Sequence, residues 1–234
     1  MGMKCSFEIP TAHAKVLRSH QDYDFTLAHM WLRSEPYRAA YDYGSVMDNG
    51  MYELGTPLEL ADLKRAVSLA RPTVAIAPDY SGDTQRTFAA WRDASSLFDC
   101  EVAGVLQGSS VAELVDLFKR YRDQACEIIC YPFRTPRIEV LKTLAAQGEL
   151  DKSHEIWHHF LGLHSMSELQ ALKAFHLIHT SIDTSKPIKA AIHNKDIHSD
   201  LKGLGRIDLE ATYDVETVDR MVFNANRFRE IAQE

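Results

Sequence analysis

Short apolar runs alternate with helical patterns along most of this chain, and this alternation constrains the fold more than any other feature. Each apolar run is followed by about ten to fifteen residues with helical spacing, which is typical of βα units and a parallel sheet. Nearly continuous apolar runs are expected for strands that helices cover on both faces. The predicted strands are residues 24–29, 45–48, 73–78, 101–107, 127–133, 159–164, 177–183 and 205–210.

Helix starts are marked by capping residues between these runs. A serine followed three residues later by a glutamate forms a capping box, and a threonine before a proline is a second typical start. The sequence predicts such starts at Thr56-Pro57, Ser110, Thr135-Pro136 and Ser165. A long amphipathic helix over residues 215–232 should pack on the outside.

Eight strands with intervening helices on 234 residues predict a (β/α)8 TIM-type barrel, with residues 1–234 as a single domain. An open doubly wound sheet is the alternative. Against it, no G-x-G-x-x-G follows the first predicted strand and no phosphate-binding P-loop occurs.

Charge and cysteine content exclude some classes. The net charge of −7 argues against a generally basic surface, although the stretch from Lys186 to Arg206 could be either a local basic patch or a solvated face. The four cysteines form no C-x-x-C pair, so we expect no structural zinc and a reducing compartment. Neither a signal peptide nor a membrane-spanning run is visible, so we expect a cytoplasmic protein.

Polar residues end most of the predicted strands. In a barrel, function gathers at the carboxyl ends of the strands. Asp and Asn are also common there because they cap turns, so any single position could be structural. The strand-end residues are His29, Asp48, Asp79, Gln107, Arg134, His164 and Asp183.

Several carboxylates without an obvious set of metal ligands suit chemistry on a glycosidic bond. One carboxylate can attack the anomeric carbon while another moves protons. An aspartate and a glutamine can read the hydrogen-bonding edge of a heterocycle. Glycines at the rim let backbone amides approach a flat ligand, and Gly50, Gly108 and Gly162 are so placed.

The order of these segments resembles the tRNA-guanine transglycosylase superfamily, which exchanges guanine for a 7-deazaguanine base. The segments that carry the resemblance cover about residues 45 to 190. They are Met47-Asp48-Asn49-Gly50, Ala77-Pro78-Asp79, Val105-Leu106-Gln107-Gly108, Phe160-Leu161-Gly162-Leu163-His164 and Ser181-Ile182-Asp183-Thr184-Ser185.

The resemblance implies a role for each matching residue. Asp183 would be the nucleophile that attacks C1′ of the nucleotide, and Asp48 would assist proton transfer. Asp79 would bind the donor edge of the base, with Gln107, Gly108 and Gly162 around its carbonyl side. No cofactor or metal is implied.

The departures from the family point to DNA as the substrate. The tRNA enzymes carry a cysteine-rich zinc site after the nucleophile, but no cysteine follows Cys130 here. The second glycine of the family's D-S-G-G segment and its aromatic-glutamine tail are not kept, and Asn49 and Met51-Tyr52 stand instead. The chain is also far shorter than the tRNA enzymes. It is most similar to the compact members of DNA modification systems, including those of phages, which insert bases such as preQ0 and would work in the host cytoplasm. The resemblance also suggests a homodimer.

Arg134, Lys186 and Lys189 are the expected phosphate contacts, because they follow strand ends or lie in the basic stretch. The enzyme would have to flip its target guanine out of the duplex.

Three alternatives remain at this stage. The same base exchange could act on tRNA. A partner subunit without catalysis is another class, although the chain keeps both Asp48 and Asp183. A metal-dependent hydrolase of the amidohydrolase kind is the third, because histidines cluster on two neighbouring strand regions. These are His158, His159, His164, His176 and His179.

Overall fold

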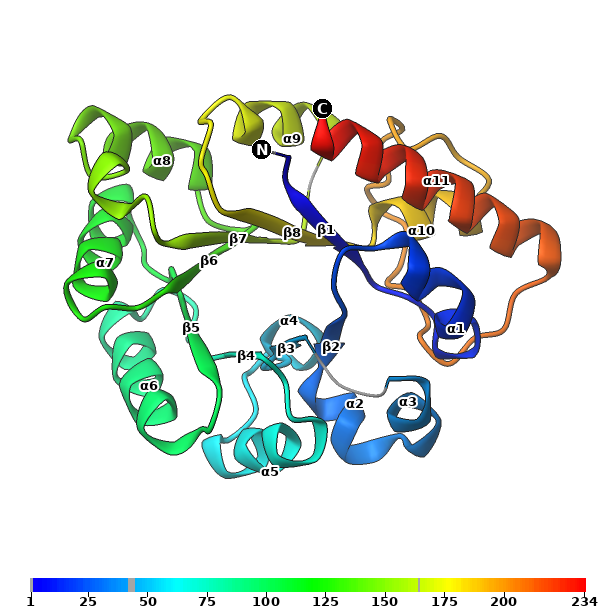
Figure 1. The fold of residues 1–234 in the computed structure, drawn as a ribbon, viewed down its shortest axis with the longest axis horizontal. Helices are drawn as coiled ribbons and strands as arrows, with labels where there is room; N and C mark the ends of the chain where they lie inside the picture. Colours follow the sequence, from blue (N-terminus) through cyan, green and yellow to red (C-terminus); the bar gives the residue numbers. More distant parts are fainter. Residues whose placement is uncertain (1, 42–44, 164) are drawn as a thin grey trace.

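The computed structural model describes residues 2–41, 45–163 and 165–234, and these residues form a nearly closed (β/α)8 barrel. Figure 1 shows the strands arranged in a ring with the helices outside it. All neighbouring strands pair in parallel, in the order β1-β8-β7-β6-β5-β4-β3-β2. The strands are β1 (Lys4–Phe7), β2 (Phe25–Leu27), β3 (Val46–Asp48), β4 (Val74–Ile76), β5 (Glu101–Val105), β6 (Ile128–Pro132), β7 (Trp157–Leu161) and β8 (Thr180–Thr184).

Side chains close the seam between β1 and β2, where the described residues form no backbone ladder. Gln21 Oε1 accepts the Phe7 N–H at 3.0 Å, and Asp22 accepts the Cys5 N–H at 2.8 Å. From the other side, the Phe25 N–H donates to Ser6 Oγ at 3.1 Å. These contacts satisfy backbone groups that would otherwise be buried without partners.

The helices surround the strands, and the last one closes the fold. The α-helices are α1 (Ala14–Leu17), α2 (Ala28–Arg33), α3 (Glu35–Ala40), α4 (Met51–Leu54), α5 (Leu60–Ala70), α6 (Thr84–Leu97), α7 (Val111–Asp123), α8 (Arg137–Ala146), α9 (Met166–Lys173), α10 (Lys186–Ile192) and α11 (Val215–Gln233). Three 3-10 turns are η1 (Thr11–His13), η2 (Arg18–His20) and η3 (Asp151–Ser153). As expected from the sequence, α11 packs outside, against α10 and β1.

The prediction of a strand over residues 205–210 was wrong. This segment has no strand structure, and Arg206 in it is exposed. The eighth strand is β1, which the sequence analysis overlooked. His29 also lies in α2 rather than at the end of a strand, and His164 is outside the described residues.

Two of the four expected helix starts are confirmed in detail. Ser110 and Ser165 cap α7 and α9, and each accepts the backbone N–H three residues later. The start at Thr56 was wrong, because α5 begins at Leu60 after Glu59. In the described part of the chain, every helix is too short or too polar to cross a membrane.

Candidate active site at the carboxyl ends of the strands

The three strand-end aspartates lie at one end of the barrel. Asp48 ends β3, Asp79 follows β4, Asp183 lies in β8, and all three are buried. Burial raises the pKa of Asp48 well above its ordinary value, and the nearby carboxylates of Glu53, Asp79 and Asp183 raise it further. The structure therefore brings these aspartates together, and it favours a protonated Asp48.

Two side-chain amides hold Asp79. Asn49 Nδ2 donates to Asp79 Oδ1 at 2.8 Å, and Gln107 Nε2 donates to Oδ2 at 2.5 Å. Asn49 is oriented by the Met51 N–H, which donates to its Oδ1, and its Nδ2 also donates to the carbonyl of Ala77. Burial raises the pKa of Asp79, whereas the two amides lower it. The sequence analysis treated Asn49 only as a departure from a family pattern, and the structure makes it a partner of Asp79.

Asp183 receives a backbone donor from the neighbouring strand. The Gly162 N–H donates to Asp183 Oδ1 at 3.2 Å. Gly162 has a φ of +68°, and a side chain there would also press on Phe133. A residue without Cβ is therefore needed to aim this N–H at the carboxylate.

A buried arginine fixes the Gly162 peptide. Arg137, at the start of α8, donates through its Nη atoms to the carbonyl oxygens of Tyr131, Leu161 and Gly162. Its Nε donates to Glu168 at 2.8 Å, so the fully buried guanidinium is paired. Arg137 was not among the sequence-predicted site residues.

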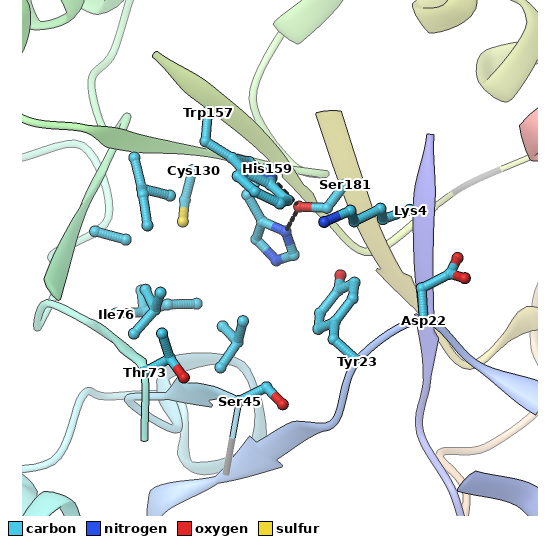
Figure 2. Close-up of a pocket in the computed structure, with 14 residues that line it drawn as sticks. Lys4, Asp22, Tyr23, Ser45, Thr73, Ile76, Cys130, Trp157, His159 and Ser181 are labelled. Carbon is cyan, nitrogen blue, oxygen red and sulfur yellow. Dashed lines mark hydrogen bonds between the residues drawn. The ribbon is translucent and has the colours of Figure 1, made fainter. Parts of the chain in front are cut away.

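A line of polar groups reaches Asp183 from beneath. Trp157 Nε1 donates to Ser181 Oγ at 2.7 Å, and Ser181 Oγ lies 2.7 Å from His159 Nδ1. The indole can only donate, so Ser181 Oγ accepts from Trp157. Its own hydroxyl proton can point at Nδ1, the arrangement in which the ring proton lies on Nε2. Nε2 lies 3.3 Å from Asp183 Oδ1, close but not aligned as a hydrogen bond. Figure 2 shows the hydrogen bonds that join Trp157, Ser181 and His159.

Two further glutamates lie near these aspartates, and neither was predicted from the sequence. Glu8 directly follows β1, and burial raises its pKa to about 7, with Glu53 and Asp183 raising it further. Burial also raises the pKa of Glu53, and its Oε2 has no hydrogen-bond partner among the described residues. Glu8 was missed because β1 was missed; as a carboxylate after a strand it fits the pattern that found Asp48.

Gly108 lies beside Gln107 where the chain passes close to two helices. A Cβ there would meet Thr84 and Glu113 at 3.2 Å, so the position has little room for a side chain. Thr84 also donates to the Gln107 carbonyl at 3.1 Å, which fixes this loop.

An aromatic and basic rim lies beside α4. Tyr52 packs edge-on against Phe133, with ring centroids 5.3 Å apart, and Arg134 and Arg206 lie over the Tyr52 ring. The guanidinium of Arg206 also donates to the carbonyls of Tyr52 and Glu53. Residues 205–210, which were expected to form a strand, therefore place Arg206 at the rim.

The expected phosphate contacts differ in their exposure. Arg134 is exposed. Lys189 is half-buried, and its ammonium donates to the Leu204 carbonyl. Lys186 is buried, and its ammonium donates to the Ser199 carbonyl at 2.9 Å. Lys186 therefore has no exposed ammonium with which to meet a phosphate.

No protein-family model matches this chain, and a search of curated proteins finds no match either.

The histidines of the hydrolase alternative point to different places. His158 bonds to the Tyr131 hydroxyl and stacks on Phe118, His159 faces Asp183, and His179 stacks on Trp157. Within the described ranges, which leave out His164, no three His, Cys, Asp or Glu side chains are grouped so as to hold a metal ion. No observation here favours the hydrolase alternative.

Proposed function

We propose that this protein is a transglycosylase that exchanges guanine in DNA for a 7-deazaguanine base of the preQ0 kind. The observation that carries the proposal is the grouping of Asp48, Asp79 and Asp183, with Asp79 held by two amides. Three carboxylates in one site can divide between attack, proton transfer and recognition of a base.

Asp183 is the proposed nucleophile. Its oxygen attacks C1′ while the bond from C1′ to the guanine N9 breaks, and the electron pair of that bond leaves with the guanine. The Gly162 N–H and His159 hold the carboxylate in place for this step. Positioning of this kind can supply several kcal/mol of the barrier.

Asp48 is the proposed proton donor and acceptor. Its raised pKa favours the carboxylic acid form, which can protonate the departing guanine. The incoming deazaguanine then returns a proton to Asp48, and its N9 attacks C1′ and displaces Asp183. Two displacements retain the configuration at C1′.

Asp79 is the proposed reader of the base. Guanine and 7-deazaguanines share a donor edge formed by N1–H and the 2-amino group, which matches a carboxylate. Gln107 and Gly108 follow β5 and Gly162 follows β7 at the same end of the barrel, and they would approach the carbonyl side of the base. A site built for hydrogen bonds rejects a base that lacks them, because its buried polar groups are then left unpaired.

The rim supports a nucleic-acid substrate. Tyr52 and Phe133 offer ring faces for an extruded nucleotide, and Arg134 and Arg206 add positive charge beside them. Of the two nucleic acids we favour DNA, because the chain has no cysteine after Cys130 from which to build the zinc site of the tRNA enzymes.

The test is incorporation of labelled guanine or labelled preQ0 into DNA and, separately, into tRNA. We expect label in DNA, a covalent protein–DNA adduct on a denaturing gel, and loss of both with Asp183→Asn. Asp93→Asn, on the exposed face of α6, is the matched control and should keep full exchange. Label in tRNA alone would overturn the choice of DNA, and full exchange by Asp183→Asn would overturn the mechanism.

A further inference from the structure

A cavity of about 190 Å³ lies inside the barrel at the amino ends of the strands, opposite the candidate active site. Its walls come from the first residues of several strands, including Val46, Val74 and Trp157. Small side chains at Ala103, Cys130 and Ser181 leave the space unfilled. Barrel interiors are normally filled by layers of side chains, so this space needs an explanation.

The size and lining of the cavity suit one small ring. An apolar cavity of about 150 Å³ is large enough to bind benzene. Here the aliphatic walls are joined by the faces of Tyr23 and Trp157, as Figure 2 shows. The occupant should therefore be a single aromatic ring rather than a chain of waters.

A cation stands at the mouth of the cavity. Lys4 Nζ lies 4.5 Å from the centre of the Trp157 ring, and no described carboxylate lies within ion-pair distance of it. Asp22, at the same mouth, is paired with Arg229 at 2.5 Å. Arg18, beside the mouth, is likewise paired with Asp24. The mouth therefore presents an ammonium suited to an acidic group.

One buried polar atom inside the cavity is also unused. The Tyr23 hydroxyl points toward Ser181 but makes no hydrogen bond of ordinary geometry with a described residue. A buried hydroxyl without a partner costs free energy, and a polar substituent on a bound ring would relieve that cost.

We propose that this cavity is a second binding site, for a small aromatic carboxylate. The ring lies among the apolar walls, the carboxylate meets Lys4 at the mouth, and a ring hydroxyl reaches Tyr23. The proposal does not rest on base exchange, because its binding test needs no nucleic acid. The cavity does share Trp157, His159 and Ser181 with the line of polar groups that reaches Asp183.

Calorimetric titration of the full chain with four probes tests the site. The probes are benzoate, 4-hydroxybenzoate, neutral benzyl alcohol, and acetate, which lacks the ring. We expect 4-hydroxybenzoate to bind most tightly, then benzoate, then benzyl alcohol, with no binding of acetate. Absence of saturable binding by both aromatic acids would overturn the proposal. Equal affinity for benzoate and benzyl alcohol would overturn the acidic specificity.

Two variants locate the binding. Ala103→Leu should fill the cavity and abolish binding of every aromatic probe, with Ala146→Leu on the exposed face of α8 as the control. Lys4→Gln should weaken benzoate about fivefold and leave benzyl alcohol unchanged. Val74→Phe provides a second filled cavity if Ala103→Leu fails to fold. Benzoate binding that survives in a folded, filled variant would place the ligand elsewhere and overturn the proposal.

Discussion

His159 Nε2 lies 3.3 Å from Asp183 Oδ1, and Ser181 Oγ lies 2.7 Å from the other ring nitrogen, Nδ1. The proposed nucleophile therefore contacts a histidine from β7 and accepts a hydrogen bond from the Gly162 N–H that follows the same strand. Both contacts restrict rotation of the Asp183 carboxylate.

His159→Phe should lower the rate of base exchange about 10- to 100-fold, because the Nε2 contact with Asp183 is lost. The KM for DNA should change little, since His159 lies beneath the carboxylate and not at the rim. Single-turnover measurements with labelled base separate the two effects. His154→Phe, at an exposed histidine, is the control. An unchanged single-turnover rate would show that His159 has no positioning role.

Asp79→Asn should lower kcat/KM for base exchange about 100-fold or more, because an amide then faces the amides of Asn49 and Gln107 and cannot accept the donor edge of the base. Competition between guanine and adenine measures the selectivity. The exposed Asp116→Asn on α7 is the control. Retained preference for guanine in Asp79→Asn would remove Asp79 from base recognition.

Arg137→Met should destabilise the fold by about 3–5 kcal/mol, because it leaves Glu168 and three backbone carbonyls without their buried partner. Urea unfolding measures the loss. Arg227→Met breaks only the exposed pair with Glu230 and should cost less than about 1 kcal/mol. Similar losses of unfolding free energy in the two variants would contradict a stabilising role for the Arg137 hydrogen bonds to Gly162 and its neighbours.

Glu8→Gln should make stability less dependent on pH. Burial raises the Glu8 pKa from 4.5 to about 7, so the folded state holds a proton that the unfolded chain releases between those values. The wild type therefore loses stability as pH rises from about 4.5 through about 7, by at most about 3 kcal/mol.

Denaturant unfolding at pH 4.5 and pH 8 measures this difference. The Gln variant should match the wild type at the lower pH and exceed it at the higher one. Glu101→Gln, at the exposed start of β5, should follow the wild type at both. A Glu8→Gln profile parallel to that of the wild type would contradict the raised pKa.

Gln21→Ala should open the seam locally, because the Phe7 N–H loses the side chain that accepts it. An unsatisfied buried donor costs about 1–3 kcal/mol. Amide hydrogen exchange at Phe7 should become faster, while exchange at Cys130 in β6 should change only as much as global stability does. Gln85→Ala on exposed α6 is the control. Unchanged exchange at Phe7 would show that Gln21 does not close the seam.

Most of the barrel could be predicted because its strands are apolar and periodic. The strands from β2 to β8 each overlap a predicted run. β1 was overlooked since the polar residues Lys4 and Ser6 interrupt its apolar run, and the Ser6 hydroxyl accepts the Phe25 N–H across the seam. The polar side chain of Ser6 thus helps to close the barrel between β1 and β2. In contrast, Ile207 and Leu209 alternate as in a strand but belong to a segment without strand structure.

Site residues could be predicted where a single polar residue marks the end of a strand, as at Asp48, Asp79 and Asp183. Contacts between residues far apart in the chain could not be predicted from the sequence. Arg137 and Glu168 are 31 residues apart, and the proton position on His159 depends on Ser181 in another strand. Such pairs leave no periodic signal in a single sequence.

The seam between β1 and β2 has a consequence for the shape of the barrel. Where strands share a backbone ladder, the spacing between them is fixed at about 4.8 Å. At the seam one backbone bond, from the Asp22 N–H to the Cys5 carbonyl at 2.8 Å, is joined by contacts of the Gln21, Asp22 and Ser6 side chains. The circumference of the barrel is therefore set here by a single backbone bond and by side-chain rotamers, so a substitution at Gln21 or Ser6 can change the spacing without breaking a ladder.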